Sequence, residues 1–336
     1  MTTRGALAKV DELLGTNPEA QLKTRETLVD SASSHPEDPA TFMVSLATEG
    51  GLQLTAGKYQ EAEKTLRHAL QIGRENPQDP KCNGLGLALA LRNLAWCLLF
   101  TQQPAEAEAD LREALAIEEK IEGPDHPDLA LTLTYLAQAL LDESRPTEAE
   151  RLLDRAINLC KPSSGTMPPN TLTTLSGIGR NLFRLERFTE ALPLQRLLVE
   201  NYRTNYGPDS YSYACALADL GKTEMQLGHL DEAIRVLQEA VDVGEKLTQG
   251  SIIIAEWQTL LAGCYAVQDK PSKAELLFRK SVLNMWHAAE ELKKDPESLA
   301  LFLGYYSDHL KTMGLNREQI AERLDRLHEG KSMPDL

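Results

Sequence analysis

The stretch EGPDHPDLA, residues 122–130, gathers residue types that can hold a metal ion or transfer protons. His126 lies between Asp125 and Asp128, and imidazole and carboxylate groups serve both as zinc ligands and as general acids and bases. A metal site needs more ligands, and no other histidine or cysteine is near in the sequence. The choice between a site and a junction of two helices depends on whether the stretch recurs.

The stretch recurs without its histidine. Residues 205–214, NYGPDSYSYA, repeat the pattern that begins at residue 121, and Ser210 takes the place of His126. Halfway between the two copies, Gly165 and Pro169 keep the spacing, again with no histidine. A residue type that changes from copy to copy is not required by the repeated structure, so chemistry at His126 is not favoured.

The residues that the copies share are those that end one helix and begin the next. Gly123 suits a left-handed helix C-cap, because glycine adopts positive φ at no steric cost. Pro127 suits the first turn of the following helix, where Asp128 would interact favourably with the helix dipole. We therefore interpret the stretch as a junction between two helices and expect neither a metal ion nor another cofactor.

The remaining sequence contains no catalytic motif. It has no Walker loop, no G-x-S-x-G, no H-E-x-x-H and no dinucleotide fingerprint. The seven histidines are scattered, and no two lie four residues apart. Carboxylate pairs such as Glu290 and Glu291 are expected on solvated helix faces. We expect that the protein is not an enzyme.

Composition excludes several classes of partner. The net charge of −15 and the pI near 5.0 argue against a surface for duplex nucleic acid, which needs a basic footprint. The most apolar run, 85–100, contains Arg92 and is too short to cross a bilayer, and the N-terminus lacks a signal-peptide core. The five cysteines form no C-x-x-C pair, which favours reduced thiols in a cytoplasmic protein. The oligomeric state stays open.

A pattern of 41 to 45 residues repeats along the chain. Residues 230–241, LDEAIRVLQEAV, place apolar side chains at the i, i+3, i+4, i+7 spacing of a helix. Two series of small residues follow the repeat and predict two closely packed helices in each copy. The first, the alanine series, is Ala62, Ala107, Ala149, Ala191, Ala233 and Ala274; the second, the glycine–alanine series, is Gly50, Ala95, Ala137, Gly179, Gly221 and Ala262. Such a hairpin buries its apolar face only by stacking on its neighbours, as in a solenoid.

These repeats resemble the tetratricopeptide (TPR) family, whose common unit has 34 residues. The longer period and the GPDHPD junction resemble the kinesin-light-chain subclass, in which the second helix is about two turns longer. The resemblance covers about residues 43–290 and implies an all-α, right-handed α-solenoid, or superhelix, of helical hairpins. We expect an N-terminal helical cap at 1–40, with helices at 6–14 and 19–31, and six repeats at 41–293. A degenerate seventh unit and a capping helix that starts with a capping box of Asn316 and Gln319 should occupy 294–336.

The resemblance also implies a binding surface, because the first helix of each TPR repeat lines the concave face. The side chains that would point inward include four cations and several aromatic rings, a composition typical of binding hot spots. The expected partner-binding residues are Arg92, Asn93, Trp96, Tyr135, Gln138, Arg180, Phe183, Arg184, Asp219 and Lys222.

Two readings of these side chains stay open at this point. Arg92, Arg180, Arg184 and Lys222 could form a basic strip that takes an acidic partner. Alternatively, Trp96 and Phe183 pack between neighbouring first helices, and Arg92 and Lys222 pair with carboxylates of the groove.

The sequence thus predicts a non-catalytic scaffold or adaptor for protein–protein interaction. Its partner would be an extended or helical segment of another protein that carries acidic residues. The alternative is a regulatory sensor, in which a bound peptide or small ligand closes the superhelix and alters an attached enzyme. Only about 40 residues precede the first repeat, fewer than a large N-terminal effector bundle would need, which favours the scaffold.

Overall fold

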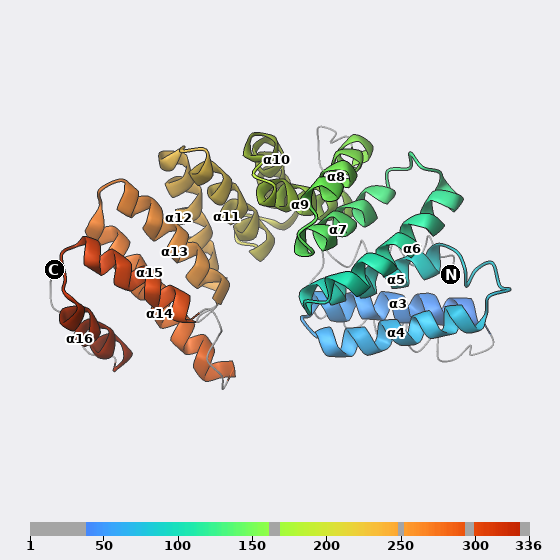
Figure 1. The fold of residues 1–336 in the computed structure, drawn as a ribbon, viewed down its shortest axis with the longest axis horizontal. Coiled ribbons are helices and arrows are strands. Elements are labelled where there is room, and N and C mark those ends of the chain that lie inside the picture. The colour runs from blue at the N-terminus through green and yellow to red at the C-terminus, as the bar shows by residue number, and fades with distance from the viewer. Residues whose placement is uncertain (1–37, 161–168, 248–251, 293–298, 330–336) are drawn as a thin grey trace. The chain divides into compact units, whose positions relative to one another are not determined.

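The structure is a computed structural model that describes residues 38–160, 169–247, 252–292 and 299–329. These residues form helices and no strands (Figure 1). The helices expected at 6–14 and 19–31 lie outside the described residues. The helices are α3 (Pro39–Thr55), α4 (Tyr59–Glu75), α5 (Leu85–Phe100), α6 (Pro104–Glu122), α7 (Leu129–Asp142), α8 (Pro146–Cys160), α9 (Pro169–Arg184), α10 (Phe188–Tyr206), α11 (Tyr211–Gln226), α12 (Leu230–Leu247), α13 (Ile252–Val267), α14 (Pro271–Leu292), α15 (Leu299–Thr312) and α16 (Arg317–His328).

The chain divides into two compact units, Met1–Arg187 and Phe188–Leu336. In the first unit α3 pairs with α4, α5 with α6 and α7 with α8, and the first helices α5 and α7 pack on α3 and α9 respectively (Figure 1). In the second unit α11 pairs with α12 and α13 with α14, while α10 packs on α11 and α15 on α14. The predicted all-α fold of successive helical hairpins is confirmed.

The two series of small residues lie at buried contacts between the helices. Every member of the alanine series is fully buried. In the glycine–alanine series, a Cβ atom on Gly221 would lie only 2.5 Å from Cγ of Leu237, and one on Gly50 only 2.4 Å from Cγ of Leu66. Both leucines are themselves fully buried in the second helix of the same hairpin. Glycine is therefore needed at Gly50 and Gly221, because a side chain there would displace a core leucine.

Each hairpin turns through a residue with positive φ at the same place in the repeat. After the first helix, the chain closes with a Schellman pattern: in one hairpin Gln103 N donates to Leu98 O at 2.8 Å and Gln102 N to Leu99 O at 3.3 Å. These bonds satisfy carbonyl groups that the helix end leaves unpaired. The positive-φ positions are Gly57, Gln102, Ser144, Glu186, Gly228 and Asp269, which have the spacing of the two series of small residues.

The junction between α6 and α7 differs in detail from the expectation. Gly123 has positive φ, 93°, but its ψ of 157° is extended and not left-handed helical. The helix α7 begins at Leu129 with Asp128 as its N-cap, so Pro127 precedes the helix and was wrongly expected in its first turn. The reason is that His126 O and Pro127 O accept from Leu129 N and Ala130 N in two successive tight turns before the regular helix starts.

Ion pairs link the second helices of neighbouring hairpins in the first unit. Arg67 of α4 forms two hydrogen bonds to Glu106 of α6, at 2.7 and 3.1 Å, and Arg112 of α6 reaches Glu148 of α8 at 2.6 Å. These side chains remain partly exposed, so each pair contributes little alone, about 0–1 kcal/mol. The two pairs occupy equivalent places in consecutive repeats and so join α4 to α6 and α6 to α8.

The second unit ends in a helix that is joined to it by a buried polar contact. Glu275 of α14 accepts from the Tyr306 hydroxyl of α15 at 2.8 Å and from Arg323 of α16 at 3.1 Å, and all three side chains are buried. The predicted capping box of α16 is present between Asn316 and Gln319.

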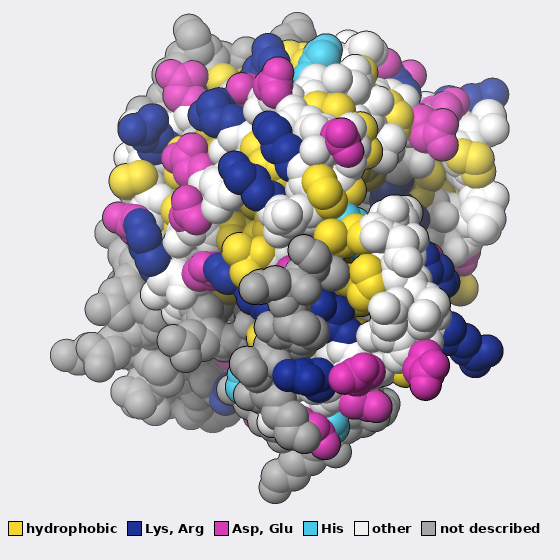
Figure 2. Space-filling view, turned by 90° about the vertical axis from the view of Figure 1, so that its left-hand side faces the viewer, with side chains coloured by type: hydrophobic (Ala, Val, Ile, Leu, Met, Phe, Trp, Pro, Cys, Tyr) yellow, Lys and Arg dark blue, Asp and Glu magenta, His cyan; other side chains and the backbone are white. Residues whose placement is uncertain are grey.

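On the side of the molecule that carries the C-terminal helices, basic, acidic and hydrophobic side chains are intermingled (Figure 2).

Candidate functional site

The residues expected to bind a partner in the first unit come from three helices that pack in order, α5 on α7 and α7 on α9. The helices α5 and α7 are the first helices of the hairpins α5–α6 and α7–α8, as the sequence predicted, whereas α9 is the last helix of the first unit and the α10 that follows it belongs to the second. We call the side chains that they contribute the first-helix surface. Its members are Arg92, Asn93, Trp96, Phe100, Tyr135, Gln138, Arg180, Phe183 and Arg184.

An aromatic row crosses this surface. The Trp96 ring stacks on Tyr135 of α7 with 6.1 Å between ring centroids and contacts Phe100 edge-on at 5.8 Å. Phe100 in turn stacks on Tyr59 of α4 at 5.1 Å. The side chain of Phe100 is 53 % exposed, which is unusual for a ring of this size in a folded protein. The row therefore runs from the buried Tyr135 through Trp96 and the exposed Phe100 to the half-buried Tyr59.

Two arginines from different helices influence the electrostatics of Tyr135, the buried member of the row. Burial raises the pKa of the Tyr135 phenol, while the positive charges of Arg92 on α5 and Arg180 on α9 oppose that rise. The tyrosine thus lies within electrostatic reach of guanidinium groups from both neighbouring first helices. Aromatic and basic side chains thus lie close together here, and Tyr135 itself is buried.

Arg92 is engaged inside its own hairpin. Its Nη1 atom lies 2.8 Å from Oε1 of Glu118 on α6. Burial raises the pKa of the Glu118 carboxyl, and the charge of Arg92 opposes this. Arg92 therefore has a carboxylate partner, but this partner lies on a second helix and not on the first-helix surface.

Arg180 and Arg184 lie one turn apart on α9 and are both exposed. Arg180 donates from Nη1 to the hydroxyl oxygen of Ser176 at 3.1 Å. Arg184 pairs with Asp142 of α7, with 2.7 Å between Nη2 and Oδ1. Both guanidinium groups therefore reach solvent while keeping a polar neighbour.

Three other members of the surface have structural contacts or limited exposure. Asn93 donates from Nδ2 to the backbone oxygen of Ala47 at 3.0 Å and so ties α5 to α3. Gln138 and Phe183 are half-buried. Asn93 therefore helps to position α5 against α3.

The two remaining expected residues belong to the second unit. Asp219 and Lys222 lie on α11, and Nζ of Lys222 is 3.6 Å from Oδ1 of Asp219. Lys222 thus has an acidic neighbour one turn away on its own helix. The first unit holds Arg92, Arg180 and Arg184, and the second holds Lys222, so the expected basic strip is divided between the two units.

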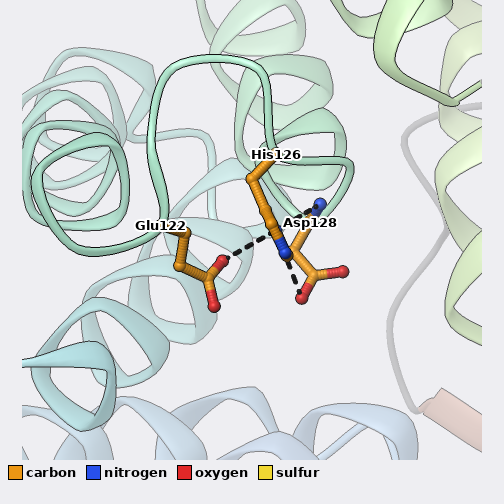
Figure 3. A group of neighbouring side chains, drawn as sticks. All are labelled: Glu122, His126 and Asp128. Carbon is orange, nitrogen blue, oxygen red and sulfur yellow. Dashed lines mark hydrogen bonds and ion pairs between the residues drawn. The ribbon is translucent and has the colours of Figure 1, made fainter.

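The structure also brings together three possible metal ligands at the α6–α7 junction, which we call the junction cluster (Figure 3). Nδ1 of His126 lies 2.9 Å from Oε2 of Glu122 and 3.7 Å from Oδ2 of Asp128. Glu122 was missed by the sequence reasoning, which looked for histidines and cysteines. Its position four residues before His126 was the available signal.

A family model described as tetratricopeptide repeat matches residues 45–120, 86–161 and 170–246. Together these ranges cover more than half of the chain, and they coincide with the helical hairpins described above. The protein belongs to the tetratricopeptide repeat family. Proteins of this family generally mediate protein–protein interactions. No curated protein sequence matches the chain.

Solved structures share the fold at low sequence identity. A putative kinesin light chain from Podosopora anserina, with nearly identical TPR-like repeats, is 20 % identical, with a TM-score of 0.50 over 60 % of this chain and 95 % of that one. The Cut9–Hcn1 hetero-tetramer of APC/C gives a TM-score of 0.59 at 18 % identity, covering 85 % of this chain and 47 % of that one. A Rap protein complexed with Competence and Sporulation Factor gives a TM-score of 0.53 at 14 % identity, covering 85 % of this chain and 80 % of that one. These likenesses establish the fold alone.

In the part of the chain that the structure describes, no helix combines the length and the apolar character that crossing a membrane requires.

Proposed function

We propose that this protein is a non-catalytic scaffold or adaptor that binds a segment of another protein on its first-helix surface. The general role of the family supports an interaction function. The observation that carries the proposal is the pair of exposed arginines on α9, one of which lies within electrostatic reach of the aromatic row. Arginine and large aromatic residues dominate the energetics of protein interfaces.

The chemistry of this surface favours an acidic segment as the partner. A guanidinium group binds a carboxylate with two parallel hydrogen bonds, which fixes both position and orientation. Arg184 already holds Asp142 in this way in part, with a single close contact of 2.7 Å, so a partner's carboxylate would compete with an exposed internal one. The exposed ring of Phe100 offers an apolar contact further along the same surface.

The five free cysteines support a reducing compartment, and we include a cytoplasmic location in the proposal. Three of them, Cys82, Cys97 and Cys264, are buried. Burial raises the pKa of each of these thiols, and nearby negative charge adds to the rise at Cys82 and Cys97. Their sulfurs are thereby kept in the less reactive thiol form.

The test is a double substitution, Arg180→Ala with Arg184→Ala. A partner is first captured from a native lysate and identified by mass spectrometry, and its affinity is then measured by calorimetry. We expect the double variant to bind at least tenfold more weakly, about 1.4 kcal/mol, with a shallower dependence on salt than the parent. Circular dichroism should show an unchanged fold, because both side chains are exposed.

A matched control removes two exposed arginines from second helices, Arg151 of α8 and Arg235 of α12. The control changes the net charge by the same amount and should leave affinity within about twofold of the parent. Full affinity in a folded Arg180/Arg184 double variant would contradict the proposal and place the site elsewhere on the molecule. Equal losses in the two double variants would show that only net charge matters.

A further inference from the structure

The junction cluster has donor atoms of the right type and spacing for one transition-metal ion. One atom each from Glu122, His126 and Asp128 lies within 4.8 Å of the other two (Figure 3). Two ligands of a tetrahedral Zn²⁺ ion, each about 2.1 Å from the metal, are separated by about 3.4 Å. The distances from Nδ1 of His126 to the two carboxylates, 2.9 and 3.7 Å, lie on either side of that value. The same Nδ1 atom accepts a hydrogen bond from the backbone N–H of Asp128 at 3.3 Å, which a bound ion would replace.

The junction does not need these side chains for its fold. Two periods later, the equivalent junction has no imidazole or carboxylate at the corresponding places, which are Tyr206, Ser210 and Ser212. There Ser210 caps α11, because its hydroxyl oxygen accepts from Tyr213 N at 3.3 Å. Asp128 has the N-cap position of α7 but makes no capping hydrogen bond with its side chain. Its carboxylate instead faces His126, so the cluster is an addition to the repeated structure.

The chain around the cluster is held from a neighbouring helix. Arg155 of α8 donates from Nη2 to the backbone oxygen of Pro124 and pairs through Nη1 with Glu119, both at 2.6 Å. The turn is closed by His126 N, which donates to Gly123 O at 3.3 Å. The side chains differ in exposure, 14 % for Glu122, 35 % for His126 and 75 % for Asp128, so one side of the cluster is open to water. An ion bound there can complete its coordination with solvent.

We propose that Glu122, His126 and Asp128 bind a divalent transition-metal ion of the zinc type. The imidazole ligand favours Zn²⁺ over Mg²⁺ and Ca²⁺, which prefer sets composed of oxygen atoms. Because Glu122 is the last residue of α6 and Asp128 directly precedes α7, the ion would join two consecutive hairpins. Binding that requires the folded arrangement stabilises the protein by mass action.

The test uses ZnCl₂ with the untagged full chain after treatment with a chelator. Calorimetry should show one site per chain that is lost in His126→Ser and weakened at least tenfold in Glu122→Gln. The matched control is Asp125→Asn, which removes a carboxylate from the same loop but outside the cluster, and it should bind as the parent does. Zinc should raise the melting temperature of the parent and the control but not that of His126→Ser.

Several outcomes would overturn the proposal. One is the absence of zinc binding by the parent. Another is equal binding by the parent and His126→Ser, which would assign the ion to the cysteines or to other surface groups. Competition by equimolar Mg²⁺ would contradict the role of the imidazole. The variant His126→Ser should fold, because Ser210 has the same place in the equivalent junction, and the isosteric Glu122→Gln gives a second, independent readout.

Discussion

Arg92 and Glu118 form an ion pair that is largely shielded from water. Their side chains are 17 % and 6 % exposed, and 2.8 Å separates Nη1 from Oε1. The pair connects the first and second helices of one hairpin, α5 and α6. Arg92, which the sequence predicts to bind a partner, thus also stabilises the interior of its hairpin. Substituting Arg92 would lower partner affinity in the first role and the free energy of unfolding in the second.

We predict that Arg92→Ala lowers the free energy of unfolding by about 3 kcal/mol, because it leaves the Glu118 carboxylate buried without its cation. The combined variant Arg92→Met with Glu118→Leu removes both charges and should recover most of this loss. Urea denaturation followed by circular dichroism measures both effects. If Arg92→Ala keeps the parent's stability and loses only partner affinity, the ion pair is dispensable and Arg92 acts on the partner.

The sequence could predict the parts of the fold that depend on local spacing. Ala149 and Gly221 belong to series with a constant period, and a period near 42 with two small residues per copy defines a hairpin without any knowledge of tertiary contacts. The capping box of Asn316 and Gln319 is equally local, since its two residues are three apart. For these features the residues that interact are near in sequence or recur regularly.

The partners of the candidate site could not be predicted in the same way. Glu118 follows Arg92 by 26 residues and lies on another helix, so their contact depends on how the two helices are rotated. The stacking of Trp96 on Tyr135 likewise depends on the packing of consecutive repeats. Glu122 was within reach of sequence reasoning, because i,i+4 residues are neighbours at a helix end, but carboxylates are so common in this acidic chain that the spacing alone singles out nothing.

The close approach of helices at Gly221 gives a second prediction. A Cβ at this position would meet Cγ and Cδ2 of Leu237 at 2.5 and 2.7 Å, and Leu237 is fully buried. We expect Gly221→Leu to cost on the order of 1–3 kcal/mol and Ala149→Leu, in the alanine series, a similar amount. Thermal melts of both variants measure the loss.

Gly263 is the matched control for Gly221, since it lies inside α13 and a Cβ there meets no atom within 4 Å. Gly263→Ala should stabilise the protein by up to about 1 kcal/mol, because alanine is the better helix former. Gly221→Ala should destabilise it in spite of the same gain in helix propensity. Equal changes in the two alanine variants would show that the hairpin tolerates a side chain at Gly221 and that the glycine–alanine series does not mark a close contact.

The last prediction concerns Asp110 of α6, whose side chain is buried. Its Oδ2 atom has no hydrogen-bond partner among the residues that the structure describes. Burial, with a further contribution from the negative charge of Glu106, raises the pKa of the Asp110 carboxyl from 3.8 to about 6. The folded protein therefore holds this proton to a higher pH than the unfolded chain does. As pH rises from about 4 through 6, Asp110 ionises freely in the unfolded chain, but burial opposes its ionisation in the folded protein. The free energy of unfolding therefore falls over this window, and the loss is complete above it.

Asp110→Asn removes the titrating group and keeps the size of the side chain. We expect the variant to match the parent below about pH 4 and to exceed its free energy of unfolding by roughly 1–3 kcal/mol at pH 7.5. Urea denaturation at both pH values measures the difference. The control Glu150→Gln, at an exposed carboxylate of α8, should change stability by less than about 0.5 kcal/mol at either pH. A constant offset between Asp110→Asn and the parent at all pH values would mean that Asp110 keeps its ordinary pKa in the folded protein, and that the substitution acts through packing.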